Sequence, residues 1–174
     1  MKKNVLVIAI FAIAVLFSNQ ITAQKFRSLD KSPLDQVTYA TKADGVIAKV
    51  FYSRPQLKGR RINKLIPEGK LWRLGANEAT EITFKKDVVF GGKSVKAGTY
   101  TMFAIPGKTE WTIILNKDTN VWGAYQYKEA QDVVRVKGKV SSSMAPIEAF
   151  SIAFDDNMNM YLGWGYTVVK VDIK

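Results

Sequence analysis

Alternating apolar and polar residues run through most of this chain and predict β-strands. The pattern is clearest over residues 80–85, where Ile82 and Phe84 fall on one face and the positions between them are polar. Such a strand is expected to bury one face only. Turn dipeptides separate the strands, with Asp44-Gly45 and Gly91-Gly92 as strong hairpin signals. The predicted strands are 36–41, 46–53, 80–85, 88–90, 93–95, 99–105, 111–116, 133–140, 147–154, and 160–164 with 166–173.

This strand pattern favours an all-β fold made of one domain. The strands are short, turn signals lie between them, and no helical period is evident after the first apolar segment. These features predict a single-domain β-sandwich, or a partly open barrel, of about nine or ten short, mainly antiparallel strands. No interior linker or repeat interrupts the pattern, so we assign residues 34–174 to this domain and residues 24–33 to a flexible N-terminal tail.

The first 23 residues have the pattern of an export signal rather than of a folded element. A short basic start at residues 1–4 precedes an apolar run over 5–17, and small residues follow before Gln24. The run is short for a membrane span, which needs about 20 apolar residues. We therefore expect a signal peptide over 1–23, cleaved near Ala23/Gln24, with an uncleaved anchor as the alternative. The mature protein is then extracytoplasmic, periplasmic or secreted, and has no transmembrane span.

Composition excludes several kinds of chemistry. The chain has no cysteine and no histidine, so disulfides, thiol catalysis, histidine-based triads and the usual zinc sites are impossible. No phosphate-binding glycine loop or nucleophile elbow is present, and we expect no cofactor. The net charge of +11 favours attraction to anionic partners such as acidic glycans or envelope phosphates. Nucleic acid is not an expected partner of an exported protein.

Residues 52–80 interrupt the alternation and concentrate basic residues. Seven bases lie between Tyr52 and Arg73, and Glu68 is the only acid there. Guanidinium groups bind carboxylate, sulfate or phosphate in a bidentate manner, and an asparagine can add an amide donor and acceptor. Loops on a rigid β scaffold often carry such sites. The candidate ligand-binding residues are Arg54, Arg60, Arg73, Asn77 and Glu78.

The same segment also has a structural interpretation. A long loop must satisfy its backbone polar groups, and arginine side chains do this well. Arg54 or Arg73 could pair with Glu78 and with loop carbonyl groups, so that the loop is an internal brace. Other bases of this segment, Lys58, Arg61 and Lys64, are expected to be solvated.

Trp122, Tyr125 and Tyr127 form a second candidate site. They lie in an irregular aromatic stretch, where exposed rings could make a platform for stacking on a sugar. Packing in the interior is the alternative for these three. Trp111 and Trp164 instead fit the strand pattern and are expected in the core.

Carboxylate chemistry is a further alternative. Glycosidases need two carboxyl groups about 5–10 Å apart across a cleft. Glu78 and Glu81 would face opposite sides of one strand, unless Glu78 lies in the preceding turn. We therefore assign no catalytic residue.

Asp155, Asn157 and Asn159 have the opening spacing of a calcium-binding loop. Such a loop needs glycine at its sixth position and glutamate at its twelfth, where this chain has Met160 and Tyr166. The segment is therefore predicted to be a hairpin turn, and no metal site is expected.

Several blocks of sequence together resemble a known family. They are Tyr52-Ser53-Arg54-Pro55, Lys58-Gly59-Arg60, Trp72-Arg73-Leu74-Gly75-Ala76-Asn77-Glu78-Ala79-Thr80, Ala97-Gly98-Thr99-Tyr100 through Ile105-Pro106, and Trp111-Thr112-Ile113-Ile114-Leu115-Asn116. This pattern is similar to the DUF2911 family, which consists of exported bacterial β-proteins of no assigned function. The resemblance extends from about Ser32 to Ile173. It implies export and a single all-β domain, and it transfers no catalytic residue.

These observations predict an exported, non-enzymatic β-module. It would bind a polar or anionic ligand, such as an anionic small molecule, a glycan or a cell-envelope component, at the Arg-rich loop 54–80. One alternative is a structural or protein-interaction domain in which that loop is an internal brace. A less favoured alternative is a carboxylate-dependent hydrolase.

Overall fold

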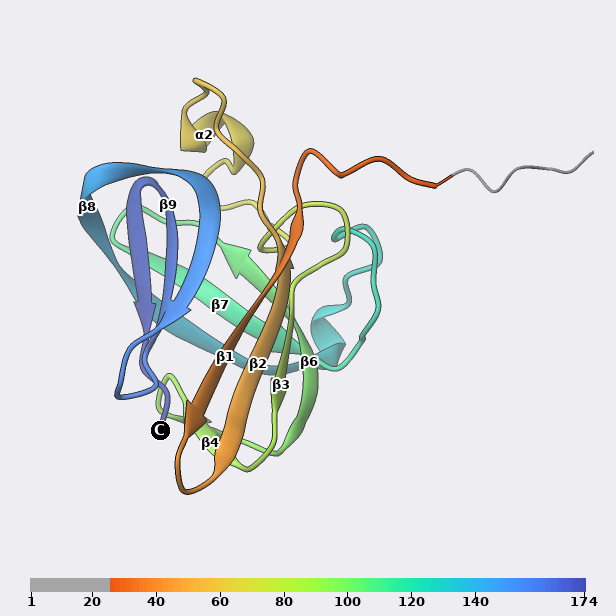
Figure 1. Ribbon diagram of the computed structural model, residues 1–174, viewed down its shortest axis with the longest axis vertical. Coiled ribbons are helices and arrows are strands. Elements are labelled where there is room, and N and C mark those ends of the chain that lie inside the picture. Colours follow the sequence, from red (N-terminus) through yellow and green to blue (C-terminus); the bar gives the residue numbers. More distant parts are fainter. Residues whose placement is uncertain (1–25) are drawn as a thin grey trace, which may run out of the picture.

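A computed structural model describes residues 26–174 of the chain (Figure 1). The predicted signal peptide, residues 1–23, lies outside the described residues. Within residues 26–174, no helix has the length and apolar character needed to cross a membrane.

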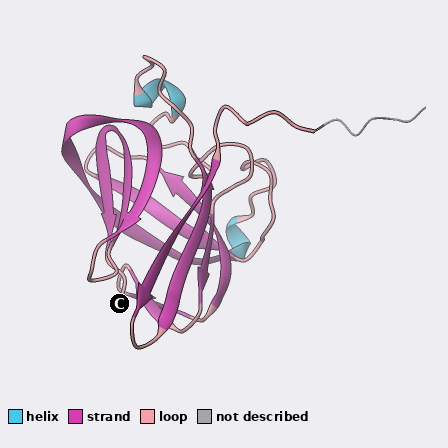
Figure 2. Ribbon diagram, in the orientation of Figure 1, coloured by secondary structure: helices cyan, strands magenta, loops and turns pink. Residues whose placement is uncertain are grey.

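The regular secondary structure of the described chain is mostly β, which confirms the predicted all-β class. One α-helical turn, α2 (Ile62–Leu65), and one 3-10 turn, η1 (Glu129–Gln131), interrupt the strands (Figure 2). The strands are β1 (Leu34–Thr41), β2 (Gly45–Ser53), β3 (Glu81–Phe84), β4 (Val88–Phe90), β5 (Lys93–Val95), β6 (Gly98–Ile105), β7 (Glu110–Asn116), β8 (Asp132–Phe154) and β9 (Met160–Val171).

Seven strands form one antiparallel sheet in the order β1-β2-β3-β6-β7-β8-β9, and β4 and β5 form a separate hairpin. The large sheet curls into a half-barrel, so the protein has the partly open barrel rather than two flat packed sheets (Figure 1). Both predicted hairpins are present, with Asp44-Gly45 between β1 and β2 and Gly91-Gly92 between β4 and β5.

Strand β8 corrects the predicted strand boundaries. The sequence predicted two strands, 133–140 and 147–154, separated by a loop, but β8 is one bent strand of 23 residues. Its first part pairs with β7 and its second part with β9, and the register shifts between Ser142 and Ile147. The residues expected to form a loop are a bulge instead: they stay extended while opposing few partners on β9. Similarly, the predicted segments 160–164 and 166–173 are joined in β9.

The residues after β2 join the β2 side of the curled sheet to β8, which lies near the other end of the strand order. Gln56 bridges to Ala149 of β8, the Leu57 N–H donates to the Glu148 carbonyl at 3.0 Å, and the Phe150 N–H donates to the Pro55 carbonyl at 2.9 Å. These bonds begin where Pro55 ends the regular ladder of β2, because proline has no N–H to donate. The start of loop 54–80 is therefore a structural closure of the half-barrel.

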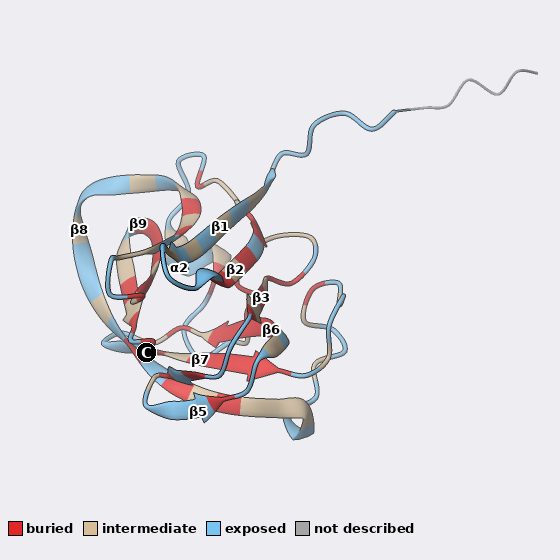
Figure 3. Ribbon diagram, turned by 60° about the horizontal axis from the view of Figure 1, so that its bottom comes forward, coloured by how far each residue is buried: buried red, intermediate tan, exposed pale blue. Residues whose placement is uncertain are grey.

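An aromatic cluster lies in the core of the half-barrel. Figure 3 shows where the buried residues lie along the strands. The ring of Trp72 stacks on Trp164 at 5.6 Å between centroids and lies edge-on to Phe150 at 5.0 Å and to Trp111 at 6.0 Å. Trp111 and Trp164 are 4% and 3% exposed, so their predicted place in the core is confirmed. The core thus holds the tryptophan that begins the most distinctive block of the sequence.

Candidate functional site

Arg54 is held by the barrel closure. Its Nε donates to the Phe150 carbonyl at 3.1 Å and its Nη2 to Ser151 Oγ at 2.8 Å, both on β8. Its Nη1 pairs with Asp35 Oδ2 of β1 at 3.1 Å. One guanidinium therefore ties the end of β2 to two other strands, which is the arrangement of a brace.

Arg60 and Arg73 have different surroundings. Arg60 donates from Nε to the Leu57 carbonyl and from Nη2 to the Gln56 carbonyl, each at 2.8 Å, so it stabilises the turn in which it lies. Arg73 is half-buried, and its Nε is a buried donor without a partner among the described residues. The three candidate arginines therefore do not converge on one site.

The turn that follows Trp72 is shaped by strained backbone and by hydrogen bonds. Leu74 and Asn77 have φ angles of 56°, a left-handed conformation that asparagine tolerates better than leucine. Trp72 Nε1 donates to the Gly75 carbonyl at 3.1 Å, and Thr80 Oγ1 donates to the Leu74 carbonyl at 2.6 Å. The turn is thus fixed from the core, and its outer residues, Asn77 and Glu78, are held at the surface.

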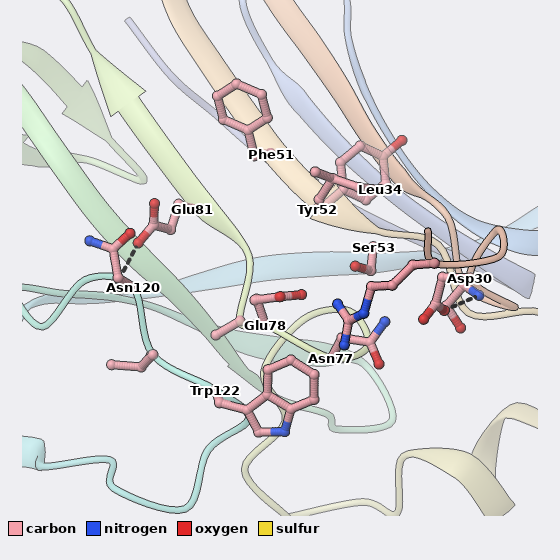
Figure 4. Close-up of a pocket in the computed structure, with 14 residues that line it drawn as sticks. Asp30, Leu34, Phe51, Tyr52, Ser53, Asn77, Glu78, Glu81, Asn120 and Trp122 are labelled. Atoms are coloured by element: carbon pink, nitrogen blue, oxygen red, sulfur yellow. Dashed lines mark hydrogen bonds between the residues drawn. The ribbon is translucent and has the colours of Figure 1, made fainter. Parts of the chain in front are cut away.

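Asn77 and Glu78 line a pocket of about 390 Å³ together with residues from five other segments, one of which is the start of β1 with Leu34. We call it the Trp122 pocket (Figure 4). The end of β2 contributes Phe51 and Ser53, β3 contributes Glu81, and the tail contributes Arg27 and Asp30. The remaining wall comes from the loop between β7 and η1, through Asn120 and Trp122.

Backbone pairing attaches this loop to the turn. The Ala79 N–H donates to the Val121 carbonyl at 3.0 Å, the Gly123 N–H donates to the Asn77 carbonyl at 3.1 Å, and Glu78 bridges to Trp122. Because residues 77–79 and 121–123 are paired, the carboxylate of Glu78 and the indole of Trp122 are held near one another (Figure 4). The indole is 59% exposed, which leaves its surface available for contact.

The polar groups of the Trp122 pocket are mainly acidic. Its lining includes the carboxyl groups of Asp30, Glu78 and Glu81 and the guanidinium of Arg27. Glu81 accepts a hydrogen bond of 2.5 Å from the Asn120 N–H, which orients that carboxylate. The Ser32 N–H, followed by the Asn77 side chain, lowers the pKa of Asp30 below its usual value, so this carboxyl group is ionised at neutral pH. The pocket is thus locally acidic in a basic protein.

Most of the chain matches one protein family. The model of the family described as "Protein of unknown function (DUF2911)" matches residues 32–173, most of the chain. The chain belongs to the DUF2911 family. No match was found among curated proteins or among solved structures. Residues 32–173 contain every described strand of the DUF2911 domain and all of the Trp122 pocket except Arg27 and Asp30.

The three predicted platform aromatics of this DUF2911 domain are separated in space. Trp122 lines the pocket, whereas Tyr125 is 84% exposed and does not line it. Tyr127 packs edge-on to Phe103 at 5.0 Å and donates its hydroxyl to Asp132 Oδ2 at 2.6 Å. Burial, with the nearby Asp132 carboxylate, raises the pKa of Tyr127 well above its usual value. Tyr127 therefore has a packing role.

Several residues that line the Trp122 pocket are absent from the candidates predicted from the sequence. Glu81 could be predicted in part, since the alternation of 80–85 directs its side chain to the face of the strand opposite Ile82 and Phe84. Phe51, Ser53 and Asn120 could not be predicted, because only the curl of the sheet brings the end of β2 beside the loop after β7.

The Asp155–Asn159 segment is a hairpin turn, as predicted. Both carboxylate oxygens of Asp155 accept hydrogen bonds from groups of the protein. Asp155 Oδ1 accepts from the N–H groups of Asn157 at 3.0 Å and Asn159 at 2.8 Å. Asp155 Oδ2 accepts from the Asn159 side-chain amide at 2.9 Å and from the Tyr161 hydroxyl at 3.1 Å. Within residues 26–174, no cluster of three potential metal-ligating side chains was found.

This turn leads to a prediction on pH dependence. Hydrogen bonds, first that from the Asn159 side chain, lower the pKa of Asp155 below 3.8. A lowered pKa stabilises the fold above the unfolded-state pKa, and that contribution is lost as the pH falls through the folded-state pKa. The difference in melting temperature between the wild type and Asp155→Asn should therefore be present at neutral pH and shrink below about pH 4. Asp156→Asn, which removes no hydrogen bond made by a side chain, is the control; a pH-independent difference would contradict the prediction.

Proposed function

We propose that this domain binds an uncharged, hydroxyl-rich ligand, such as a glycan of the cell envelope, in the Trp122 pocket. The observation that carries the proposal is the exposed indole of Trp122 beside carboxylate and amide groups in one pocket. A sugar ring has an apolar C–H face that can stack on an indole, and hydroxyl groups around its edge. An aromatic wall with polar groups at its rim matches that distribution.

The size and shape of the pocket support a small ligand. Its volume of about 390 Å³ is within the range of about 300–1,000 Å³ usual for small-molecule sites. Glu78 and Glu81 can accept hydrogen bonds from hydroxyl groups, and the side-chain amides of Asn77 and Asn120 can both donate and accept. These groups suit a neutral polar ligand.

The local charge argues for an uncharged rather than an anionic ligand at this pocket. Three carboxyl groups and one guanidinium line it, so an anion would meet net repulsion. Arg54 and Arg60, two of the three arginines predicted to attract an anion, already donate to groups of the protein itself. The third, Arg73, does not line this pocket. The sequence predicted a polar or anionic ligand at loop 54–80. We therefore propose the polar ligand, at the Asn77–Glu78 end of that loop.

The direct test is binding of the protein to an array of neutral, acidic and amino oligosaccharides, followed by calorimetry with the strongest binder. We expect the strongest binder to be neutral. Trp122→Ala should weaken its affinity about tenfold, equivalent to about 1.4 kcal/mol, because the stacking surface is lost. Glu78→Gln should weaken it less, since an amide oxygen still accepts a hydrogen bond.

Tyr125→Ala is the matched control, because it removes an exposed aromatic side chain of the same loop that does not line the pocket. Its affinity should equal that of the wild type. Failure to bind any oligosaccharide, or equal affinities of the wild type and Trp122→Ala, would refute the proposal.

A second function, hydrolysis of the bound glycan, is favoured by one observation: Glu78 and Glu81 line the same pocket, because Glu78 lies in the turn before β3. Mass spectrometry of the oligosaccharide after incubation separates the two functions. Intact oligosaccharide indicates binding alone. Cleavage by the wild type that is lost in both Glu78→Gln and Glu81→Gln would indicate a hydrolase.

A further inference from the structure

Residues 57–70, which we call the spur, project beyond the sheet and carry α2 near their tip (Figure 1). The spur contains five basic residues and one acidic residue, Glu68. The basic residues Lys58, Arg60, Arg61, Lys64 and Lys70 are all exposed.

The spur is fixed to the half-barrel at its base. Leu57 and Ile66 are buried in the core, and Ile62 and Leu65 pack against it. The Lys58 N–H donates to Glu148 Oε1 at 2.7 Å, and the Gly69 N–H donates to the Pro106 carbonyl at 2.9 Å. The basic side chains are therefore presented on a preformed support.

Within residues 26–174, these charges have no partner of opposite sign. None of the five basic side chains takes part in an ion pair within residues 26–174. Outside the spur, Lys86, Lys96 and Arg135 each pair with a carboxylate. An unpaired cluster on a projection is the part of this basic protein best placed to meet an anionic surface first.

We propose that the spur docks the protein on the anionic headgroups of a lipid membrane. A projecting segment whose basic side chains are all exposed can approach a flat, extended layer of phosphates without a groove to receive them. A linear polyanion would be bound best by a groove lined with bases. Basic residues near an anionic membrane each strengthen binding by about fivefold, so a cluster of this size gives measurable adsorption. The acidic Trp122 pocket would then take a different ligand from the docking surface.

Co-sedimentation with vesicles tests this inference. The protein used starts at Gln24 and so contains all the described strands. It is mixed with phosphatidylcholine vesicles that contain or lack phosphatidylglycerol. We expect binding only to vesicles that contain phosphatidylglycerol, and weaker binding at high salt. The triple variant Arg61→Gln/Lys64→Gln/Lys70→Gln should lower the partition coefficient by at least about tenfold. These three side chains make no hydrogen bond within the described structure, so the variant should keep the wild-type melting temperature.

The control variant removes the same charge from the opposite end of the molecule. Lys42 lies between β1 and β2, Lys85 between β3 and β4, and Lys93 begins β5. The turn between β1 and β2 and strand β4 lie at the end of the molecule away from α2 (Figure 1). All three lysines are exposed and make no ion pair within residues 26–174. Lys42→Gln/Lys85→Gln/Lys93→Gln should retain most of the binding. An equal loss in both triple variants would overturn the inference in favour of net charge alone. Binding to soluble dextran sulfate but not to the vesicles would overturn it in favour of a polymer. Trp122→Ala should still bind the vesicles, which separates this test from that of the pocket.

Discussion

Replacing Trp72 with alanine is expected to lower the free energy of unfolding by about 3–5 kcal/mol. The indole is 9% exposed and contacts the rings of Trp111, Phe150 and Trp164. Its Nε1 also donates to the Gly75 carbonyl, so the substitution leaves both a cavity and an unsatisfied acceptor. Because this bond helps to shape the turn before Asn77, ligand binding at the Trp122 pocket should weaken as well.

Denaturant unfolding followed by circular dichroism measures this effect without relying on tryptophan fluorescence. Trp122→Ala is the matched control, since it truncates the same type of side chain at a position that is 59% exposed. Its free energy of unfolding should stay within about 0.5 kcal/mol of the wild type. A cost below about 1 kcal/mol for Trp72→Ala would show that the aromatic cluster is not the main source of core stability.

The sequence predicted the strands well wherever one face of a strand meets solvent. In β3, the alternation around Ile82 and Phe84 corresponds to buried residues, and Glu81 and Thr83 lie on the other, half-buried face. In such strands apolar and polar residues alternate along the sequence, so the period of two residues can be recognised from the sequence alone. The hairpin turns were also predicted correctly. Gly45, Gly91 and Gly92 have positive φ angles, which favour glycine over other residues.

The course of β8 could not be predicted in the same way. Residues 141–146 are rich in serine and contain Pro146, which is typical of a loop. The structure keeps them extended because β9 and the segment 55–57 pair with the residues on either side. Such pairing depends on partners far away in the sequence, so it cannot be predicted from local composition.

The most distinctive block of the sequence, residues 72–80, has two roles that the sequence did not separate. Trp72, Leu74 and Thr80 face the interior, whereas Asn77 and Glu78 line the pocket. Asn77 and Glu78 were predicted to form a site with the arginines of the same loop because they are neighbours along the chain. In space, those two residues lie with Trp122 and Glu81, which come from other segments.

Replacing Arg54 with methionine is expected to lower the free energy of unfolding by about 2 kcal/mol. The variant loses the hydrogen bonds to the Phe150 carbonyl and to Ser151 Oγ, and it loses the pair with Asp35. The pair itself is partly exposed and contributes at most about 1 kcal/mol of this. Arg54→Lys should recover less than half of the loss, because an ammonium group cannot reproduce the planar fork that reaches three partners at once. Thermal and denaturant unfolding of the three proteins measure the differences.

Arg60→Met is the control for this prediction, because Arg60 bonds only the carbonyl groups of Gln56 and Leu57 in its own turn. Its cost should stay below about 1 kcal/mol, since no second strand is released. The comparison decides between the two interpretations of the Arg-rich loop. If Arg54→Met unfolds more easily and the folded fraction binds ligand with unchanged affinity, Arg54 is a brace. If its stability is unchanged and ligand binding is lost, Arg54 recognises the ligand, and the site must extend from the Trp122 pocket towards the barrel closure.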